Sequence, residues 1–220
     1  MSEKINIAGI YDLRTLRLLK SKGIKSFGFE FSPTSFNFLQ AHIFLNDLLP
    51  LIQTSDEIIL HFSHSSDLMI EKLLLDIKKQ SNISGSQIIL ACDKWSEPPS
   101  EKGVRYLLNY GQYCEWNSSL DTEFAGVVLD FDFLNKLHID GVLLSFIQNF
   151  YSTNKTFLDG EKLLILRAEW SSNIFPSLFD SMDFDRVSLP LDSKVEVCYR
   201  NMDLKKLSFE IDLFQYNYQI

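Results

Sequence analysis

Eight short apolar segments, separated by stretches with helical patterning, constrain the fold of this chain more than any other feature. Most of the segments are continuously apolar, as in "EIILHF" and "QIILAC", which is typical of strands covered on both faces. The alternation therefore predicts a parallel sheet packed between helices. The segments span residues 5–10, 26–31, 57–62, 87–92, 113–116, 126–131, 163–168 and 186–189.

The intervening stretches place apolar residues at helical spacing. In the first of them, Leu16 and Leu19 fall on one side, and Gly23 follows as a C-cap would. Pro50 should kink or restart the second, and the connection at 117–124 has room for one turn only. We predict helices over residues 12–23, 45–53, 66–80, 100–110, 140–151, 171–182 and 202–214.

Eight strand–helix units in 220 residues favour a closed barrel. The main alternative is an open doubly wound sheet, but no glycine-rich phosphate fingerprint follows the first apolar segment. The chain has no sharp repeat, low-complexity tract or linker. We therefore predict one (β/α)₈ barrel domain over residues 1–220.

Composition excludes several classes of protein. The net charge is −8, and no segment gathers lysine and arginine beside aromatic residues, which argues against a nucleic-acid partner. No apolar run approaches the ~20 residues of a membrane span, and the first residues lack the pattern of a signal peptide. The three cysteines form no CxxC pair, which fits a reducing compartment. These features predict a soluble cytoplasmic protein.

Two stretches near the start resemble a known family. "INIAGIYDLRTLRLLKSKG" followed by "FGFEFSPTSFNFL" is similar to the start of phosphoribosylanthranilate isomerase, the barrel enzyme of tryptophan biosynthesis. Beyond residue 40, only the order and lengths of the segments fit. The resemblance implies a (β/α)₈ barrel and an Amadori rearrangement of N-(5'-phosphoribosyl)anthranilate, an aldose–ketose isomerisation that needs no cofactor and no metal.

The resemblance also implies where the catalytic groups belong. The family's base is a cysteine of the first strand, whose position here is Ala8, and alanine cannot accept a proton. The family's acid is an aspartate at the end of the sixth strand, which corresponds to Asp130. A substrate-binding arginine of the family falls on Asn37, while Gly9 keeps a small position of the family pattern.

The family holds the substrate's phosphate with backbone N–H groups in glycine-rich turns after strands six, seven and eight. Here Arg167, Ala168 and Glu169 replace the turn of strand seven. Pro190 removes a backbone donor after strand eight. We expect Arg167 and Glu169 to stand where substrate would be bound.

Glu30 lies within an aromatic-rich strand, "SFGFEF". Side chains alternate between the faces of a strand, so if Ala8 points into the barrel, Gly28 and Glu30 do too. An acid in a barrel interior needs a partner or a proton. We expect either a structural ion pair with Arg167 or its neighbour, or a functional role as replacement base or ligand-binding group.

Two aspartates and a pair of histidines are further candidates for functional residues. Asp130 is either the acid or a polar strand end that caps the next segment, and Asp132 would share its face in an extended strand. His61 and His64 form a His-x-x-His pair without a suitably spaced third ligand, so we predict no metal site.

Two functions follow. The first is an isomerase that uses Asp130 as acid and Glu30 as base on a small sugar phosphate. The second is a non-catalytic binding or interaction protein descended from such an enzyme, and the replaced residues favour it. In both, we expect a monomer or homodimer.

Overall fold

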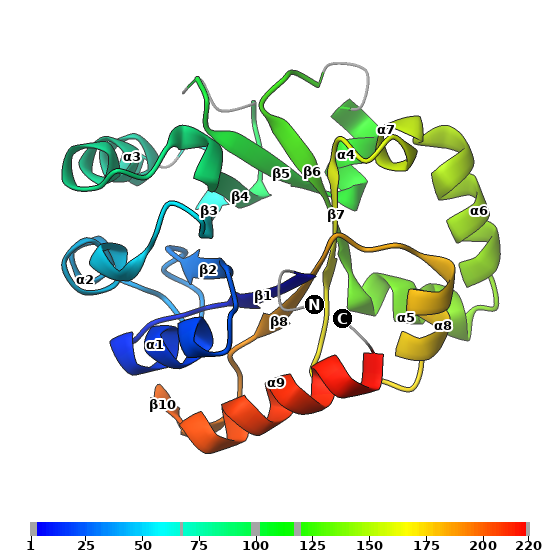
Figure 1. Cartoon of the computed structure of the whole chain (residues 1–220). Coiled ribbons are helices and arrows are strands. Elements are labelled where there is room, and N and C mark those ends of the chain that lie inside the picture. The colour runs from blue at the N-terminus through cyan, green and yellow to red at the C-terminus, as the bar shows by residue number, and fades with distance from the viewer. Residues whose placement is uncertain (1–3, 67, 98–101, 117–119, 219–220) are drawn as a thin grey trace.

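A computed structural model describes residues 4–66, 68–97, 102–116 and 120–218 of the chain. Its eight main strands form a closed barrel in chain order, and β8 pairs with β1 to complete the ring (Figure 1). All eight pairings are parallel. The predicted (β/α)₈ barrel is confirmed.

The strands place matching residues at the same level around the ring. Glu30 pairs with His61, and Asp130 with Arg167, at the carboxyl ends of neighbouring strands. Sites of this fold lie at that end. The strands are β1 (Ile5–Ala8), β2 (Ser26–Glu30), β3 (Glu57–His64), β4 (Ile88–Lys94), β5 (Arg105–Asn109), β6 (Phe124–Asp130), β7 (Leu163–Arg167) and β8 (Arg186–Pro190).

Helices surround the barrel (Figure 1). Asp12 caps the first of them, because its side chain accepts hydrogen bonds from the backbone N–H groups of Arg14 and Thr15. A two-stranded hairpin, β9 (Glu196–Cys198) and β10 (Asn201–Met202), precedes the last helix. The helices are α1 (Leu13–Ser21), α2 (Ala41–Ile43), α3 (Leu68–Gln80), α4 (Tyr110–Trp116), α5 (Phe131–Ile139), α6 (Leu143–Thr153), α7 (Lys155–Leu158), α8 (Phe175–Ser181) and α9 (Leu204–Tyr218).

One strand and one helix exchange places relative to the sequence prediction. The predicted strand at 113–116 belongs to α4, and the predicted helix at 100–110 contains β5, with residues 100 and 101 outside the described part of the chain. Tyr106 and Leu108 are fully buried beneath the helices, while Leu107 lies with the side chains inside the barrel. This alternation of period two identifies a strand.

Two further segments differ from expectation. The stretch predicted as one kinked helix at 45–53 consists of a wide turn, η2 (Phe44–Leu48), and a tight one, η3 (Leu49–Leu51), which contains Pro50. The segment after β6, where the family resemblance places a phosphate turn, is the regular helix α5.

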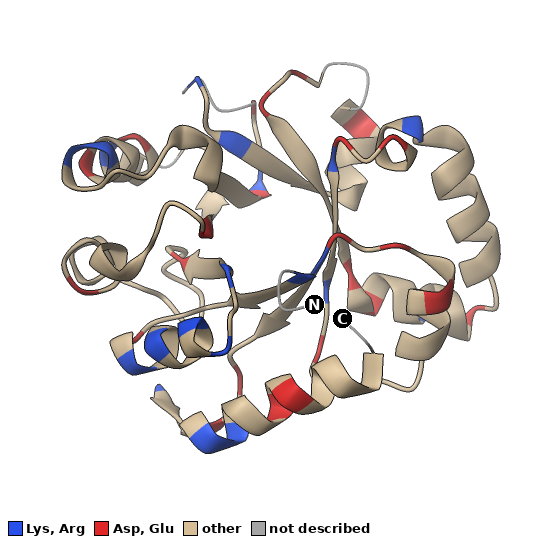
Figure 2. Ribbon diagram, viewed as in Figure 1, with Lys and Arg blue, Asp and Glu red and all other residues tan. Residues whose placement is uncertain are grey.

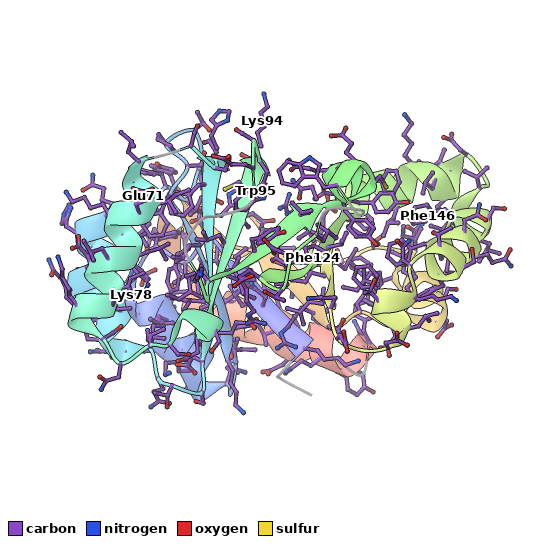
Figure 3. All side chains as sticks on the ribbon, turned by 90° about the horizontal axis from the view of Figure 1, so that it is seen from above. Glu71, Lys78, Lys94, Trp95, Phe124 and Phe146 are labelled. Carbon is purple, nitrogen blue, oxygen red and sulfur yellow. The ribbon has the colours of Figure 1, made fainter. Side chains whose placement is uncertain are left out.

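The core has two parts. The larger lies between the strands and the helices, and includes Phe27, Phe29 and Phe31, as the alternation in β2 predicts. Figure 3 shows how side chains fill this layer, with Trp95 and Phe124 among them and Glu71 and Lys78 on the exposed side of α3. The smaller part lies inside the barrel and consists of Ile59, Ile89, Ala91, Leu107, Ala125, Val128 and Ile165.

Charged residues of both signs are interspersed over the helices and strand ends, although α6 carries none (Figure 2). Among the described residues, no helix is long and apolar enough to span a bilayer.

Candidate functional site

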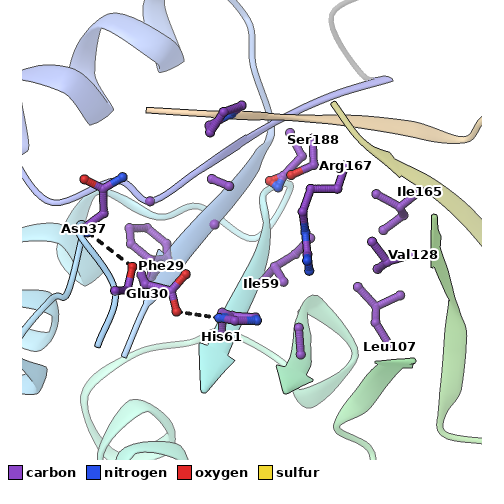
Figure 4. Close-up of a pocket in the computed structure, with 17 residues that line it drawn as sticks. Phe29, Glu30, Asn37, Ile59, His61, Leu107, Val128, Ile165, Arg167 and Ser188 are labelled. Atoms are coloured by element: carbon purple, nitrogen blue, oxygen red, sulfur yellow. Dashed lines mark hydrogen bonds and ion pairs between the residues drawn. The ribbon is translucent and has the colours of Figure 1, made fainter. Parts of the chain in front are cut away.

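A cavity of about 300 Å³ opens within the barrel and is lined by residues of the strands and of the segments that follow β1 and β2 (Figure 4). One part of its wall is apolar and consists of Ile59, Ala91, Leu107, Val128 and Ile165. The polar lining residues are Asn6, Glu30, Ser35, Asn37, His61, Arg167 and Ser188. The volume is at the small end of the range of ligand sites, roughly 300–1,000 Å³.

Glu30, His61 and Asp93 form a chain of charges across the ends of β2, β3 and β4. Nδ1 of His61 lies 2.5 Å from Oε1 of Glu30 (Figure 4). Nε2 of the same ring lies 3.2 Å from Oδ1 of Asp93. The Glu30 and His61 side chains are each only 19% exposed, so little water screens their interaction.

These contacts determine the charge of the imidazole. Burial lowers the pKa of His61, but the hydrogen bonds to Asp93 and Glu30 and the charges of both carboxylates outweigh it and raise the pKa to about 9. Conversely, the hydrogen bond from His61 lowers the pKa of Asp93 against the opposing effect of burial, and the charges of His61, Arg167 and His64 lower it further. His61 is therefore a cation at neutral pH.

Arg167 pairs with Asp130 rather than with Glu30. Its Nη1 lies 3.0 Å from Oδ1 of Asp130, and the two side chains are 43% and 44% exposed. The predicted ion pair between Glu30 and Arg167 is therefore wrong, because Glu30 faces His61 on the adjoining strand while Arg167 has Asp130 directly beside it in the register. Figure 4 shows Arg167 extending into the cavity.

Asn37 and Gly9 are in close contact at the ends of β1 and β8. Nδ2 of Asn37 donates to the carbonyl oxygen of Leu191 at 2.6 Å. Gly9 has a φ of +81°, and an added Cβ would lie 2.5 Å from Nδ2 of Asn37, so both its conformation and its neighbour require glycine. Both residues line the cavity.

The ends of β7 and β8 are bridged by a residue that sequence reasoning missed. Trp170 is 4% exposed, and its Nε1 donates to the carbonyl oxygen of Pro190 at 2.8 Å. Glu169, in contrast, is exposed and lies outside the cavity lining. A tryptophan three residues after the end of β7 was the available signal, since a buried indole needs an acceptor for its N–H.

Sequence reasoning also missed Asn6, Asp93 and Ser188. Asn6 lies two residues before Ala8 on the same face of β1, so strand alternation could have identified it. Asp132 does not share a strand face with Asp130, because it lies exposed in the first turn of α5. Within the described ranges, no group of three or more His, Cys, Asp and Glu side chains is arranged to hold a metal ion.

Comparison with known proteins gives a likeness of structure. No protein-family model matches the sequence, and no curated protein is significantly similar to it. Among solved structures, phosphoribosylanthranilate isomerase from Thermotoga maritima aligns over 97% of this chain and 99% of its own, with 16% identity and a TM-score of 0.61. The Thermus thermophilus enzyme also has 16% identity, covers 97% and 99% of the two chains and has a TM-score of 0.57.

The enzyme from Pyrococcus furiosus aligns over 98% of this chain and 99% of its own, with 13% identity and a TM-score of 0.58. Identities this low establish a shared fold and leave the activity to be argued from the site. The structural resemblance predicted from the opening residues of the chain is thus confirmed over nearly its full length: the barrel has the fold of phosphoribosylanthranilate isomerases.

Proposed function

We propose that this chain is a ligand-binding barrel that holds a small, unphosphorylated molecule in the cavity at its mouth and does not carry out the Amadori rearrangement. It would act in the cytoplasm, as a monomer or homodimer. The observation that carries the proposal is the burial of Trp170 across the ends of β7 and β8, where the resemblance places the phosphate.

Two backbone donors at this place are already engaged. The N–H of Ala168 donates to the carbonyl oxygen of Ser188 at 2.9 Å, and the N–H of Leu191 donates to that of Ala8 at 3.0 Å. Pro190, which precedes Leu191 in the chain, has no N–H. A phosphate cradle depends on several converging N–H groups, and these two form hydrogen bonds between neighbouring strand ends instead.

The groups for proton transfer are also unfavourably placed. Ala8 has no proton acceptor, and one oxygen of Asp130 is engaged by the guanidinium of Arg167. A general acid must present its carboxyl group to the substrate, which here requires breaking that pair.

A second candidate is an isomerase that uses Glu30 as its base. The contact between β1 and β2 favours it: an added Cβ on Gly28 would lie 2.9 Å from Cα of Ala8, so Gly28, two residues before Glu30 on the same face of β2, lies beside the position of the family's base. Asp130 would be the acid, and the substrate a sugar phosphate of tryptophan biosynthesis.

The deciding experiment offers N-(5'-phosphoribosyl)anthranilate to the purified chain and follows its fluorescence. The binding of reduced 1-(o-carboxyphenylamino)-1-deoxyribulose 5-phosphate, which one of the structural neighbours holds in its complex, is measured by calorimetry. We expect no turnover and no binding, and we expect Ala8→Cys to restore neither. Turnover that falls in both Glu30→Gln and Asp130→Asn would overturn the proposal and establish the second candidate.

A further inference from the structure

Arg167 supplies the cavity with a cation that has hydrogen-bonding capacity to spare. It lines the cavity and extends into it from β7, and its side chain is 43% exposed (Figure 4). A guanidinium carries five N–H donors, and Asp130 contacts only one of its nitrogens, Nη1. The charge of Arg167 also lowers the pKa of Asp93 on β4, so the guanidinium acts across the mouth of the barrel. Arg167 can therefore bind a second acidic group that enters the cavity.

Glu30 supplies an anion from another part of the wall. β2 and β7 are separated by β1 and β8 in the closed ring, so Glu30 and Arg167 line the cavity from strands that are not neighbours. Oε1 of Glu30 contacts His61, but an ionised carboxylate has about four acceptor positions. Because the Glu30 side chain lines the cavity and is 19% exposed, an ammonium group in the cavity can donate to it.

Another side of the cavity is aliphatic. Figure 4 shows Leu107, Val128 and Ile165 in a row facing the cavity, and Ile59 and Ala91 extend this surface. None of these side chains carries a hydrogen-bonding group. A polar group of a ligand placed against them would lose its hydrogen bonds to water, whereas an aliphatic group is favoured there.

We infer that the cavity binds an α-amino acid with an aliphatic side chain, with its carboxylate on Arg167, its ammonium group on Glu30 and its side chain against the aliphatic surface. This inference rests on the proposed function and names its ligand class. A volume of about 300 Å³ is that of roughly ten water molecules in the liquid, and valine and leucine have about eight or nine non-hydrogen atoms.

The charges around the mouth favour a ligand that carries both signs. The anions there are Glu30, Asp93 and Asp130, and the cations are His61 and Arg167. A ligand with only a carboxylate would add to this excess of negative charge. A ligand with only an ammonium group would leave the guanidinium of Arg167 without a second acceptor. An amino acid brings both groups and no net charge.

Calorimetric titration of the full chain at neutral pH tests the inference with L-leucine and L-valine as probes. 3-Methylbutylamine lacks the carboxylate of leucine, and 4-methylpentanoate lacks its ammonium group. D-ribose 5-phosphate and inorganic phosphate test for a phosphate site. We expect at least one of the two amino acids to bind, about tenfold or more tightly than either analogue, because each analogue loses one charge-assisted hydrogen bond.

Arg167→Gln and Arg14→Gln form a matched pair of variants. The two arginine side chains are 43% and 65% exposed and each contacts an aspartate, but Arg14 lies on α1, outside the cavity lining. Arg167→Gln should weaken binding of the amino acid about tenfold or more and leave binding of 3-methylbutylamine unchanged, since the amine has no carboxylate. Arg14→Gln should change neither.

Two further variants test the other contacts. Glu30→Gln should weaken binding of the amino acid and of 3-methylbutylamine alike, because both carry the ammonium group. Ala91→Val narrows the aliphatic side of the cavity, so the affinity for leucine should fall several-fold relative to that for L-alanine. If Arg167→Gln or Glu30→Gln fails to fold, Ala91→Val replaces it.

The outcomes distinguish the inference from the proposed function beneath it. Binding of ribose 5-phosphate or inorganic phosphate in preference to the amino acids would overturn both. The inference alone would be overturned if neither leucine nor valine binds, or if an analogue with a single charge binds as tightly. It would also be overturned if Arg167→Gln, or Ala91→Val in its place, binds leucine as wild type does, or if Arg14→Gln loses as much affinity as Arg167→Gln.

Discussion

The two ends of the barrel both carry carboxylates paired with cations, but in opposite arrangements. At the amino-terminal end, Glu57 lies between two arginines: its Oε2 is 2.8 Å from Nη2 of Arg105, and its Oε1 is 3.8 Å from Nε of Arg186. Ser26 donates a further hydrogen bond to Oε1 at 3.3 Å. At the carboxyl-terminal end, the cation His61 lies between two carboxylates beside a cavity.

The difference separates charges that close a barrel from charges that surround a cavity. The groups around Glu57 come from the first residues of β2, β3, β5 and β8, and they contact one another. Those at the other end stand around about 300 Å³ of space. Conservation of charge pairs at the amino-terminal end of this fold relates to stability, while the opposite end carries function.

The largest effect we expect comes from opening the carboxyl-terminal end. Trp170→Ala should lower the free energy of unfolding by about 4 kcal/mol, because it removes a buried indole and its hydrogen bond to Pro190. Urea unfolding measures this. We also expect weak binding of ribose 5-phosphate to appear, since the indole no longer covers the ends of β7 and β8.

Trp95→Ala is the matched control. Trp95 is also buried, and its Nε1 donates to the carbonyl oxygen of Leu107 at 2.9 Å. It should cost similar stability without new phosphate binding. A loss below about 1 kcal/mol in Trp170→Ala would contradict the bridging role of the indole.

The second effect is a pH dependence confined to the carboxyl-terminal end. The contacts of His61 raise its pKa from 6.5 to about 9 on folding. Because the folded pKa is the higher one, the contribution of His61 to stability is fully present below pH 6.5 and is lost as the pH rises through 9. Integrated over that window it is about 3 kcal/mol.

Urea unfolding at intervals from pH 6 to pH 9.5 measures this loss. His61→Gln should remove most of the pH dependence, while His138→Gln, at an exposed position of α5, should leave it unchanged. A wild-type stability that stays constant over the window would contradict the charged state of His61.

The third effect concerns the amino-terminal end. Glu57→Gln leaves two arginine side chains without their counter-charge, and should lower the free energy of unfolding by about 2 kcal/mol, less than for a fully buried pair because the three side chains are 17–32% exposed. Ligand binding at the mouth and the pH dependence of stability should not change.

The exposed pair of Lys4 and Asp183 provides the control. These side chains are 50% and 92% exposed, so Asp183→Asn should have almost no effect on unfolding. If Glu57→Gln abolishes the pH dependence of stability that His61 causes, the two ends are not independent, and the comparison fails.

The two ends of the barrel also show which structural features could be predicted from the sequence and which could not. The strand–helix alternation predicted the barrel, and the period of two in β2 predicted the inward face of Glu30, because both are local patterns. The partner of Glu30 could not be predicted, since His61 lies on the next strand and its position depends on the register between β2 and β3. The bridge from Trp170 to Pro190 joins two strands and was invisible for the same reason.

The exchanged elements have a different cause. The segment around Tyr106 contains apolar residues that satisfy both periods over a short length, and a Pro-Pro pair before it suggested the start of a helix. Packing decides such cases: Tyr113 is buried on one side of α4 against Phe124, while β5 must cross the barrel wall between β4 and β6.

The smallest effect we expect is at Asp130, the residue to which the family resemblance gives the largest role. Asp130→Asn removes one partner of an ion pair whose side chains are 43% and 44% exposed. Water and salt screen such a pair, so the free energy of unfolding should fall by less than about 1 kcal/mol, and by still less in 0.5 M NaCl.

Glu30→Gln, which breaks the more buried contact with His61, should lower the free energy of unfolding by more, and this loss should depend less on salt. Ligand binding in the cavity should persist in Asp130→Asn, because Asp130 lies outside the cavity lining and the amide still accepts a hydrogen bond from Arg167. A loss of ligand binding in Asp130→Asn would move the recognition of the ligand from the interior of the cavity to its rim, where the resemblance places the family's acid.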